Sequence, residues 1–219
     1  GKCVRSCPAN KEYGYEGYFD GFAQKKYYLG YHADNRIRRE SSSGGVCKTL
    51  IIDSLKNGMV DGAYSLKCTD SFPFAQGEFY TREHIPSFGD MPNSVYHSVM
   101  ACTEIDRIQP CKRLMLVGTA CQLRALNSII KDKCDEVVRV CIFCKQQKTL
   151  DSTRFLAKMM GTSVPPNLKF RPRYRGDGWP GIVRVDGFEL PYSRAAQIPF
   201  GKRLWTVPGC GICGDSFGM

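Results

Sequence analysis

The sequence predicts an α/β fold with a mixed, mostly parallel sheet flanked by helices. Short apolar runs typical of buried strands alternate with segments whose apolar residues recur at helical spacing. The composition is that of a globular protein, with 42% hydrophobic and 24% charged residues in 219, which excludes a disordered or fibrous chain. No apolar run reaches the roughly 18 residues that a membrane-spanning helix needs, so we expect no membrane span.

The first helix and strand are predicted in the first third of the chain. Apolar residues recur at helical spacing from Val46 to Leu55, and Gly58 is a typical C-terminal stop. Residues 59–66 predict a strand. Residues 68–98 are rich in turn-forming types and predict no clear element.

Two more strand–helix units follow. Residues 113–117 form a short apolar run typical of a buried strand, and residues 118–121 turn the chain into a helix. Residues 137–143 predict the next strand, and residues 149–160 a further helix. This alternation is the reason to expect parallel strands.

The C-terminal part has a different character. Residues 182–190 predict a small β-hairpin around the Asp186-Gly187 turn. We therefore expect three parts: a cysteine-containing segment over residues 1–12, an α/β core over residues 13–160, and residues 161–219 with the hairpin and two final cysteines.

The chain is basic, with 31 Lys and Arg against 21 Asp and Glu and a formal charge of +10. Such a chain usually binds an acidic partner: a nucleic acid, a phosphorylated cofactor, an acidic protein or a membrane surface. Aromatic residues gather between positions 13 and 31, but no RRM, KH or zinc-finger pattern occurs, so we expect no nucleic acid. The alternative is a zinc-stapled module that binds nucleic acid or protein without catalysis.

Twelve cysteines are many for a chain of this length. No secretion signal is visible, so metal binding is a better interpretation than disulfides. Cys3-x3-Cys7-Pro8 matches the end of the bacterial ferredoxin pattern, which predicts a short remnant of a ferredoxin-type [4Fe-4S] domain. Two ordinary thiols would have the same spacing.

Three further cysteines stand out. Cys210-x2-Cys213 fits a zinc knuckle, a redox dithiol or a corner of an iron–sulfur site. With Cys141 and Cys144 it would make an all-cysteine zinc site. Cys121 follows a predicted strand and opens a helix, a position that favours the thiolate, although a small buried residue is the alternative. We expect the remaining cysteines to be buried structural residues: Cys47, Cys68, Cys102, Cys111 and Cys134.

Two segments suggest phosphate binding. Ser41-Ser42-Ser43-Gly44-Gly45 opens a helix, where free amides and hydroxyls favour an anion, and Arg36, Arg38 and Arg39 precede it. Plain N-capping by serine is the alternative. Arg171, Arg173 and Arg175 lead into the glycine-rich residues 176–181, which also suit a solvent-exposed loop.

Several motifs together resemble the beta subunits of coenzyme F420 hydrogenases and dehydrogenases, a family to which 7-hydroxymethyl chlorophyll a reductase is related. They span residues 3–215 in the family's order. The motifs are Ser42-Ser43-Gly44-Gly45, Gly58-Met59-Val60-Asp61-Gly62-Ala63, Gly118-Thr119-Ala120-Cys121-Gln122, Ile142-Phe143-Cys144, Gly178-Trp179-Pro180-Gly181 and Cys210-x2-Cys213-x-Asp215.

The resemblance implies an iron–sulfur flavoprotein oxidoreductase. It would pass electrons between ferredoxin-type clusters and FAD, with hydride transfer to or from a deazaflavin or similar small molecule, beside a ferredoxin or a hydrogenase/dehydrogenase partner subunit. One or two [4Fe-4S] clusters are implied. The cluster ligands would be Cys121, Cys144, Cys210 and Cys213, with Cys3 and Cys7 in the ferredoxin part. FAD contacts would come from Ser42, Ser43, Gly44, Gly45, Gly118, Thr119, Arg173 and Trp179.

The chain departs from the family pattern at three places. Ala120 replaces the usual proline, Val95 replaces a lysine, and Cys141 stands where glycine is usual, so Cys141 competes with Cys144 as a ligand. We also expect the chain to be truncated at both ends and to act in the cytoplasm or in a eukaryotic organelle. No catalytic side chain can be named from the sequence.

Overall fold

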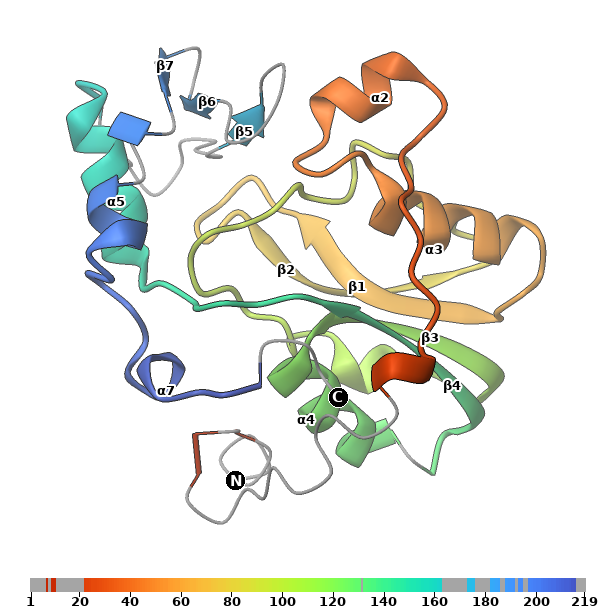
Figure 1. The fold of residues 1–219 in the computed structure, drawn as a ribbon. Helices are drawn as coiled ribbons and strands as arrows, with labels where there is room; N and C mark the ends of the chain where they lie inside the picture. The colour runs from red at the N-terminus through yellow and green to blue at the C-terminus, as the bar shows by residue number, and fades with distance from the viewer. Residues whose placement is uncertain are drawn as a thin grey trace.

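The computed structural model describes residues 7, 9–10, 22–130, 132–162, 173–175, 182–185, 188–191, 193–194 and 197–215 (Figure 1). The helices are η1 (Phe22–Gln24), α2 (Asn35–Glu40), α3 (Val46–Lys56), η2 (Ile105–Arg107), α4 (Ala120–Ile130), α5 (Leu150–Met159), η3 (Gln197–Gly201) and α7 (Pro208–Gly211). The strands are β1 (Gly62–Cys68), β2 (Ala75–Thr81), β3 (Cys111–Thr119), β4 (Cys134–Ile142), β5 (Arg173–Arg175), β6 (Ile182–Val185) and β7 (Phe188–Pro191).

The main sheet has four strands in the order β2-β1-β3-β4. β1 pairs with β3 and β3 with β4 in parallel, whereas β2 is antiparallel to β1. The predicted α/β fold with a mixed, mostly parallel sheet is therefore confirmed. The strand that the sequence did not predict, β2, lies within the turn-rich residues 68–98.

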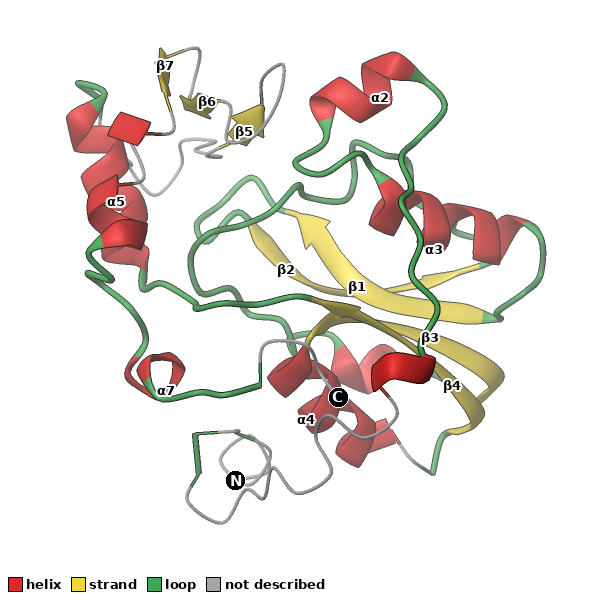
Figure 2. Ribbon diagram, viewed as in Figure 1, coloured by secondary structure: helices red, strands yellow, loops and turns green. Residues whose placement is uncertain are grey.

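Helices cover both faces of this sheet (Figure 2). Side chains alternate along β3, so Met115 and Val117 pack with α3 while Leu114 and Leu116 pack with α4. The α3 side contains Ile51 and Leu55, both almost fully buried. Each helix thus buries one apolar stripe on one face of the sheet, which explains the helical spacing seen in the sequence.

The carboxyl ends of β1, β3 and β4 meet at one edge of the sheet because these strands are parallel. α4 begins at that edge, directly after β3. α3 also begins there, because it runs back along the sheet before residues 57–61 turn the chain into β1. Ligand sites of open α/β sheets lie at this edge.

A third cluster joins α5 to a small antiparallel sheet in the order β5-β6-β7. Leu156, Ala157 and Met160 pack on Phe74 and on Val183 of β6. The predicted hairpin is confirmed by the pairing of β6 with β7, whereas its Asp186-Gly187 turn lies outside the described residues.

The N-terminal part contains one helix that the sequence did not predict. Residues 35–40 form the short helix α2, which Asp34 caps by accepting a hydrogen bond from the Arg36 amide at 2.7 Å. Tyr27, Tyr28 and Leu29 are exposed rather than packed. In the part of the chain that the structure describes, no helix has the length and apolar character needed to cross a membrane.

Candidate functional site

The corner between β3 and α4 holds Cys121 at the start of the helix. Gln122 accepts hydrogen bonds from the Thr119 amide at 2.9 Å and from the Thr119 hydroxyl at 3.0 Å. A side chain at Gly118 would meet the Gln122 oxygen at 3.1 Å, so this close approach favours glycine. Gly118, Thr119 and Gln122 therefore fix the turn that presents the exposed Cys121 thiol.

Cys144 lies just beyond the end of β4 and faces the other three predicted cluster cysteines. Burial, together with the charges of Cys121, Cys210 and Cys213, raises the pKa of the Cys144 thiol to about 11. These charge interactions place the four side chains in the same region of the molecule. Three segments far apart in the sequence contribute them.

Cys141 has different surroundings. It packs with the apolar residues under α4, and burial raises the pKa of its thiol. Its charged neighbours are Asp215, Cys121 and Arg124, and neither Cys210 nor Cys213 is among them. Cys144 is therefore the better placed of the two for a site that includes Cys210 and Cys213.

The segment that carries Cys210 is held by the chain that follows β4. Lys148 pairs with Thr206 in an antiparallel bridge, and the Val207 amide donates to the Gln147 carbonyl at 3.0 Å. The Lys148 side chain is fully buried, and its ammonium donates to the Thr206 hydroxyl at 2.8 Å and to the Leu204 carbonyl at 3.2 Å. The short helix α7 follows and carries Cys210.

An ion pair holds the end of this segment against α4. The Asp215 carboxylate has no exposed surface and lies 3.2 Å from the guanidinium of Arg124. The two residues join the helix that begins with Cys121 to the segment that carries Cys213. The Asp215 of the Cys210-x2-Cys213-x-Asp215 motif thus has a positioning role that the sequence alone did not reveal.

A fifth thiol, Cys7, lies beside this segment. An added Cβ at Gly209 would stand 3.7 Å from the Cys7 sulfur, and the charge of Cys7 raises the pKa of Cys210. The sequence placed Cys7 in a separate ferredoxin part. The structure places it beside Gly209 and near Cys210, while Cys3 lies outside the described residues.

The four cysteines offer only thiolates, a donor type that both zinc and [4Fe-4S] clusters accept. Among the described residues, no three His, Cys, Asp or Glu side chains are close enough to hold one metal ion. The all-cysteine zinc site from Cys141, Cys144, Cys210 and Cys213 is therefore not assembled. A [4Fe-4S] cluster takes one thiolate at each of four iron atoms, so its ligands stand farther apart than those of zinc.

The predicted flavin-phosphate turn lies at the same end of the sheet. Gly44 and Gly45 have positive φ angles of 76° and 81°, and Gly45 precedes the first turn of α3 without a side-chain cap. Ser42 accepts a hydrogen bond from the Ser94 amide at 3.1 Å, and Ser43 is exposed. Arg38 stacks on Tyr31 at 4.0 Å in the adjoining segment.

The second predicted basic loop is described only in part. Arg173 belongs to β5, but its side chain is outside the described part of the structure, as is the whole of Trp179. The proposed contacts of these two residues with a cofactor therefore stay predictions.

Comparison with known proteins gives a matching family model and similar solved folds. The model of the coenzyme F420 hydrogenase/dehydrogenase beta subunit N-terminus matches residues 27–83. This match supports the family predicted from the motifs over that part of the chain. The matched residues of this beta-subunit family run from the segment before α2 through α3 and β1 to the end of β2.

The fold resembles a chain of the F420-reducing [NiFe] hydrogenase complex from Methanosarcina barkeri, studied by xenon derivatization. The TM-score is 0.62 at 16% identity, which shows similarity of fold. The match covers 86% of this chain and 65% of the hydrogenase chain. No curated protein sequence matches this chain.

Sequence reasoning missed three site residues: Lys148, Arg124 and Asp215 as a positioning group. The C-x2-C-x-D pattern was a signal for Asp215, because a carboxylate two residues after a ligand is well placed to anchor it. No sequence pattern indicated Arg124 or Lys148, because their partners are 91 and 58 residues away.

Proposed function

We propose that this chain is the electron-transferring part of an iron–sulfur flavoprotein, with a [4Fe-4S] cluster held by Cys121, Cys144, Cys210 and Cys213. One observation carries the proposal: the Cys144 thiol has the other three as its charged neighbours, although they come from distant parts of the sequence. Four cysteines at the carboxyl edge of a parallel sheet are a donor set typical of such clusters.

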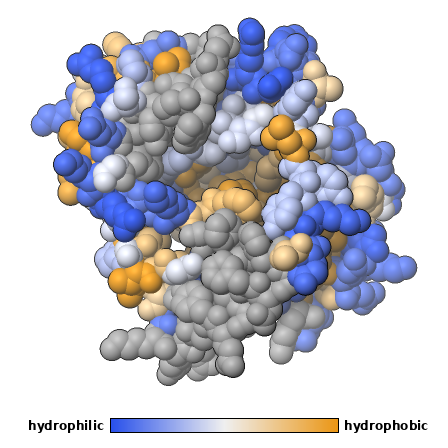
Figure 3. Space-filling view, in the orientation of Figure 1, coloured by the Kyte–Doolittle hydropathy of each residue, from blue (hydrophilic) through white to orange (hydrophobic). Residues whose placement is uncertain are grey.

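We propose FAD as the second cofactor, beside the turn from Ser42 to Gly45. This turn lies at the carboxyl edge of the sheet, as the cysteines do. Backbone amides at the start of the 11-residue helix α3 and the arginines of α2 suit a diphosphate. Figure 3 shows apolar side chains in a hollow near the centre of the face that carries this region, a suitable surface for an aromatic ring system.

When bound, FAD would supply the exchange between single-electron transfer and hydride transfer. The chain's own residues would position the cluster ligands and tune the cluster. Gln122 and Thr119 orient Cys121, the Arg124–Asp215 pair fixes Cys213, and Lys148 holds residues 204–207 ahead of Cys210. The deazaflavin-like substrate and the ferredoxin or hydrogenase/dehydrogenase partner belong to the same proposal, on the strength of the family match.

The deciding experiment is an analysis of iron, acid-labile sulfide, zinc and flavin in the chain purified without oxygen, together with its visible spectrum. We expect about four iron atoms and one FAD per chain. About eight iron atoms would mean that Cys3 and Cys7 also take part in a cluster. Zinc without iron or flavin would overturn the proposal and favour a zinc-stapled binding module.

A further inference from the structure

Two cysteines outside the proposed cluster lie against each other at the opposite end of the sheet. The sulfur atoms of Cys111 and Cys134 are 3.1 Å apart. Both residues are half-buried. Cys111 is the first residue of β3 and Cys134 the first of β4. We propose that Cys111 and Cys134 form a cross-strand disulfide when the chain meets a low-molecular-weight disulfide.

The strand register brings the pair together. Cys111 is the direct partner of Cys134 in the parallel ladder, and two residues further Arg113 is the partner of Glu136. The Arg113 guanidinium lies 2.7 Å from the Glu136 carboxylate, so side chains at matched positions of these two strands meet. Neighbouring strands lie about 4.8 Å apart, within the range of Cα separations that a disulfide spans.

The sulfur separation favours a disulfide over a shared metal ion. Two thiolates on one zinc ion, each at about 2.3 Å in tetrahedral geometry, would stand about 3.8 Å apart. The observed 3.1 Å is shorter, and a closing movement of about 1 Å gives the length of an S–S bond. Side-chain rotation alone can supply such a movement.

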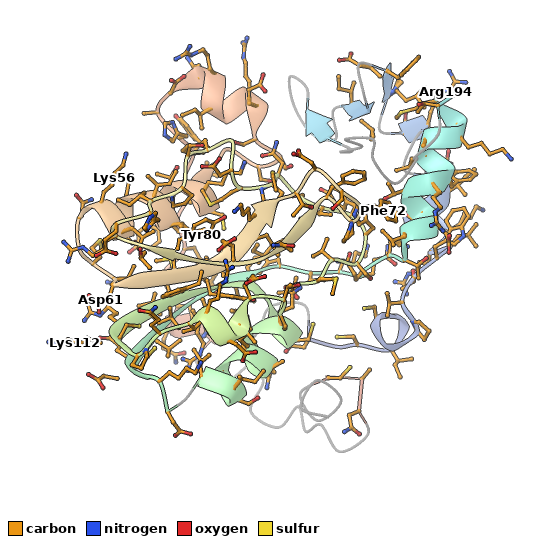
Figure 4. All side chains as sticks on the ribbon, turned by 180° about the vertical axis from the view of Figure 1, so that it is seen from behind. Lys56, Asp61, Phe72, Tyr80, Lys112 and Arg194 are labelled. Atoms are coloured by element: carbon orange, nitrogen blue, oxygen red, sulfur yellow. The ribbon has the colours of Figure 1, made fainter. Side chains whose placement is uncertain are left out.

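The pair is remote from the proposed cluster. Cys111 begins the nine-residue strand β3, which spans about 26 Å, and Cys121 lies two residues beyond its other end. Seen from behind in Figure 4, Lys112 and Asp61 mark this end of the sheet, away from α5. The inference therefore does not depend on the proposed cofactors.

The reaction is thiol–disulfide exchange with a compound such as oxidised glutathione. One cysteine thiolate attacks the reagent and releases one glutathione thiol, which leaves a mixed disulfide on the protein. The second cysteine attacks the protein sulfur of that mixed disulfide and releases the other glutathione thiol. The two cysteines are oxidised, and the reagent is reduced to two thiols that take up the two protons.

The surroundings make this reaction slow at neutral pH. Burial raises the pKa of Cys111 to about 12, and the hydrogen bond and charge of Cys134 act in the same direction. The thiolate is the attacking species, so the rate should rise with pH. The pair is then a reduced dithiol under ordinary conditions and a disulfide only under sustained oxidation.

Peptide mapping tests the proposal directly. The reduced 219-residue chain is incubated without oxygen at about pH 8 with excess oxidised glutathione, alkylated, denatured and digested with trypsin. Trypsin releases residues 108–112 and 134–139, each with a single cysteine. We expect these two peptides to be linked, and the link to disappear on reduction. Both peptides recovered alkylated, or each carrying only glutathione, would overturn the proposal.

Variants separate this pair from the other cysteines. In Cys111→Ser and Cys134→Ser the link should be absent, with glutathione on the remaining cysteine, whereas Cys47→Ser on α3 should retain it. Oxidation should raise the urea midpoint of the unchanged chain and leave that of Cys111→Ser unchanged. A rise of equal size in Cys111→Ser would count against a stabilising link between β3 and β4.

Discussion

The choice between Cys141 and Cys144 depends on which thiol faces Cys210 and Cys213. Cys144 has both as charged neighbours, whereas Cys141 packs under α4 near the Arg124–Asp215 pair. We predict that Cys144→Ser lowers bound iron to below half of the unchanged chain's value, because a cluster ligand is lost. Cys141→Ser is the matched control and should keep most of its iron. The reverse ranking would make Cys141 the ligand.

Lys148 brings a positive charge to the thiol site. Its side chain is fully buried, and its charge opposes the rise that burial causes in the pKa of Cys210. Since a positive charge favours adding an electron, we predict that Lys148→Met shifts the reduction potential of the proposed cluster to more negative values. A redox titration followed by electron paramagnetic resonance measures the shift. Lys145→Met, at an exposed neighbouring position, is the control, and an equal shift in both variants would contradict this role.

His97 joins α5 to the loop before β2. Its Nε2 donates to the Pro73 carbonyl at 2.8 Å, so the neutral ring accepts from the Thr153 hydroxyl at Nδ1, also at 2.8 Å. Burial lowers the pKa of this histidine from 6.5. The unfolded chain therefore binds a proton at a higher pH than the folded chain. The contribution of neutral His97 to the stability of the fold is fully present above about pH 6.5. It decreases as the pH falls from there toward the folded-state pKa of this histidine.

The prediction for His97 is a urea midpoint that is lower at pH 5.5 than at pH 7.5. His97→Gln should remove most of this difference, although its midpoint at pH 7.5 will also be lower because a buried contact changes. His84→Gln, at an exposed position, should keep the full difference. If His97→Gln and the unchanged chain show the same pH dependence, another group is responsible.

At the scale of elements, the Arg124–Asp215 pair connects α4 to the segment after α7. Asp215 is fully buried while Arg124 is about one-third exposed. Removal of Arg124 takes the guanidinium away from a buried carboxylate, and we predict that Arg124→Met lowers the free energy of unfolding by about 2 kcal/mol or more. Equilibrium urea unfolding measures the loss.

The exposed pair of Arg154 and Asp151 on α5 is the matched control. Their atoms are 3.0 Å apart, but both side chains are more than half exposed. Arg154→Met should change stability by at most about 0.5 kcal/mol. The double variant Arg124→Met with Asp215→Asn should recover part of the loss, because the uncompensated charge is gone. Equal effects of the two arginine variants would contradict a special role for the buried pair.

Local sequence patterns predicted those helices and strands whose buried apolar residues recur at regular intervals along the sequence. β3, α3 and α4 belong to this group, because each buries a regular stripe or alternation. β2 was not predictable in this way. Its Gly77 weakens the strand pattern, yet the Tyr64 side chain crosses that position and donates a hydrogen bond to the Ala101 carbonyl. That contact joins residues 37 positions apart, beyond the reach of a local pattern.

At the scale of the whole molecule, the family resemblance grouped four cysteines that no local spacing in the sequence brings together. Cys121 and Cys210 are brought together by the parallel sheet and by the bridge between Lys148 and Thr206. Cys7 and its spacing to Cys3 predict a ferredoxin remnant, and the fold adds that the Cys7 sulfur lies beside Gly209. Spacing indicates which residues bind together only when the ligands lie in one short segment.

The net charge of +10 predicts a salt-dependent electron transfer with an acidic partner. The exposed Lys145 directly follows Cys144, the exposed Lys202 lies in the segment that leads to Cys210, and Lys56 lies at the far end of the molecule in Figure 4. We predict that reduction by an acidic ferredoxin slows as salt rises from about 0.02 M to about 0.5 M, because the Debye length falls. Stopped-flow absorbance at several ferredoxin concentrations measures the rate.

Charge reversal then locates the docking surface. Lys145→Glu and Lys202→Glu should each slow the reaction at low salt and flatten its salt dependence, because attraction near the site is lost. Lys56→Glu makes the same change in net charge far from the thiols and should have a much smaller effect. Since long-range steering by the net charge alone would slow all three variants equally, that result would contradict docking at the cysteine edge, and it would move the partner's approach to another face of the sheet.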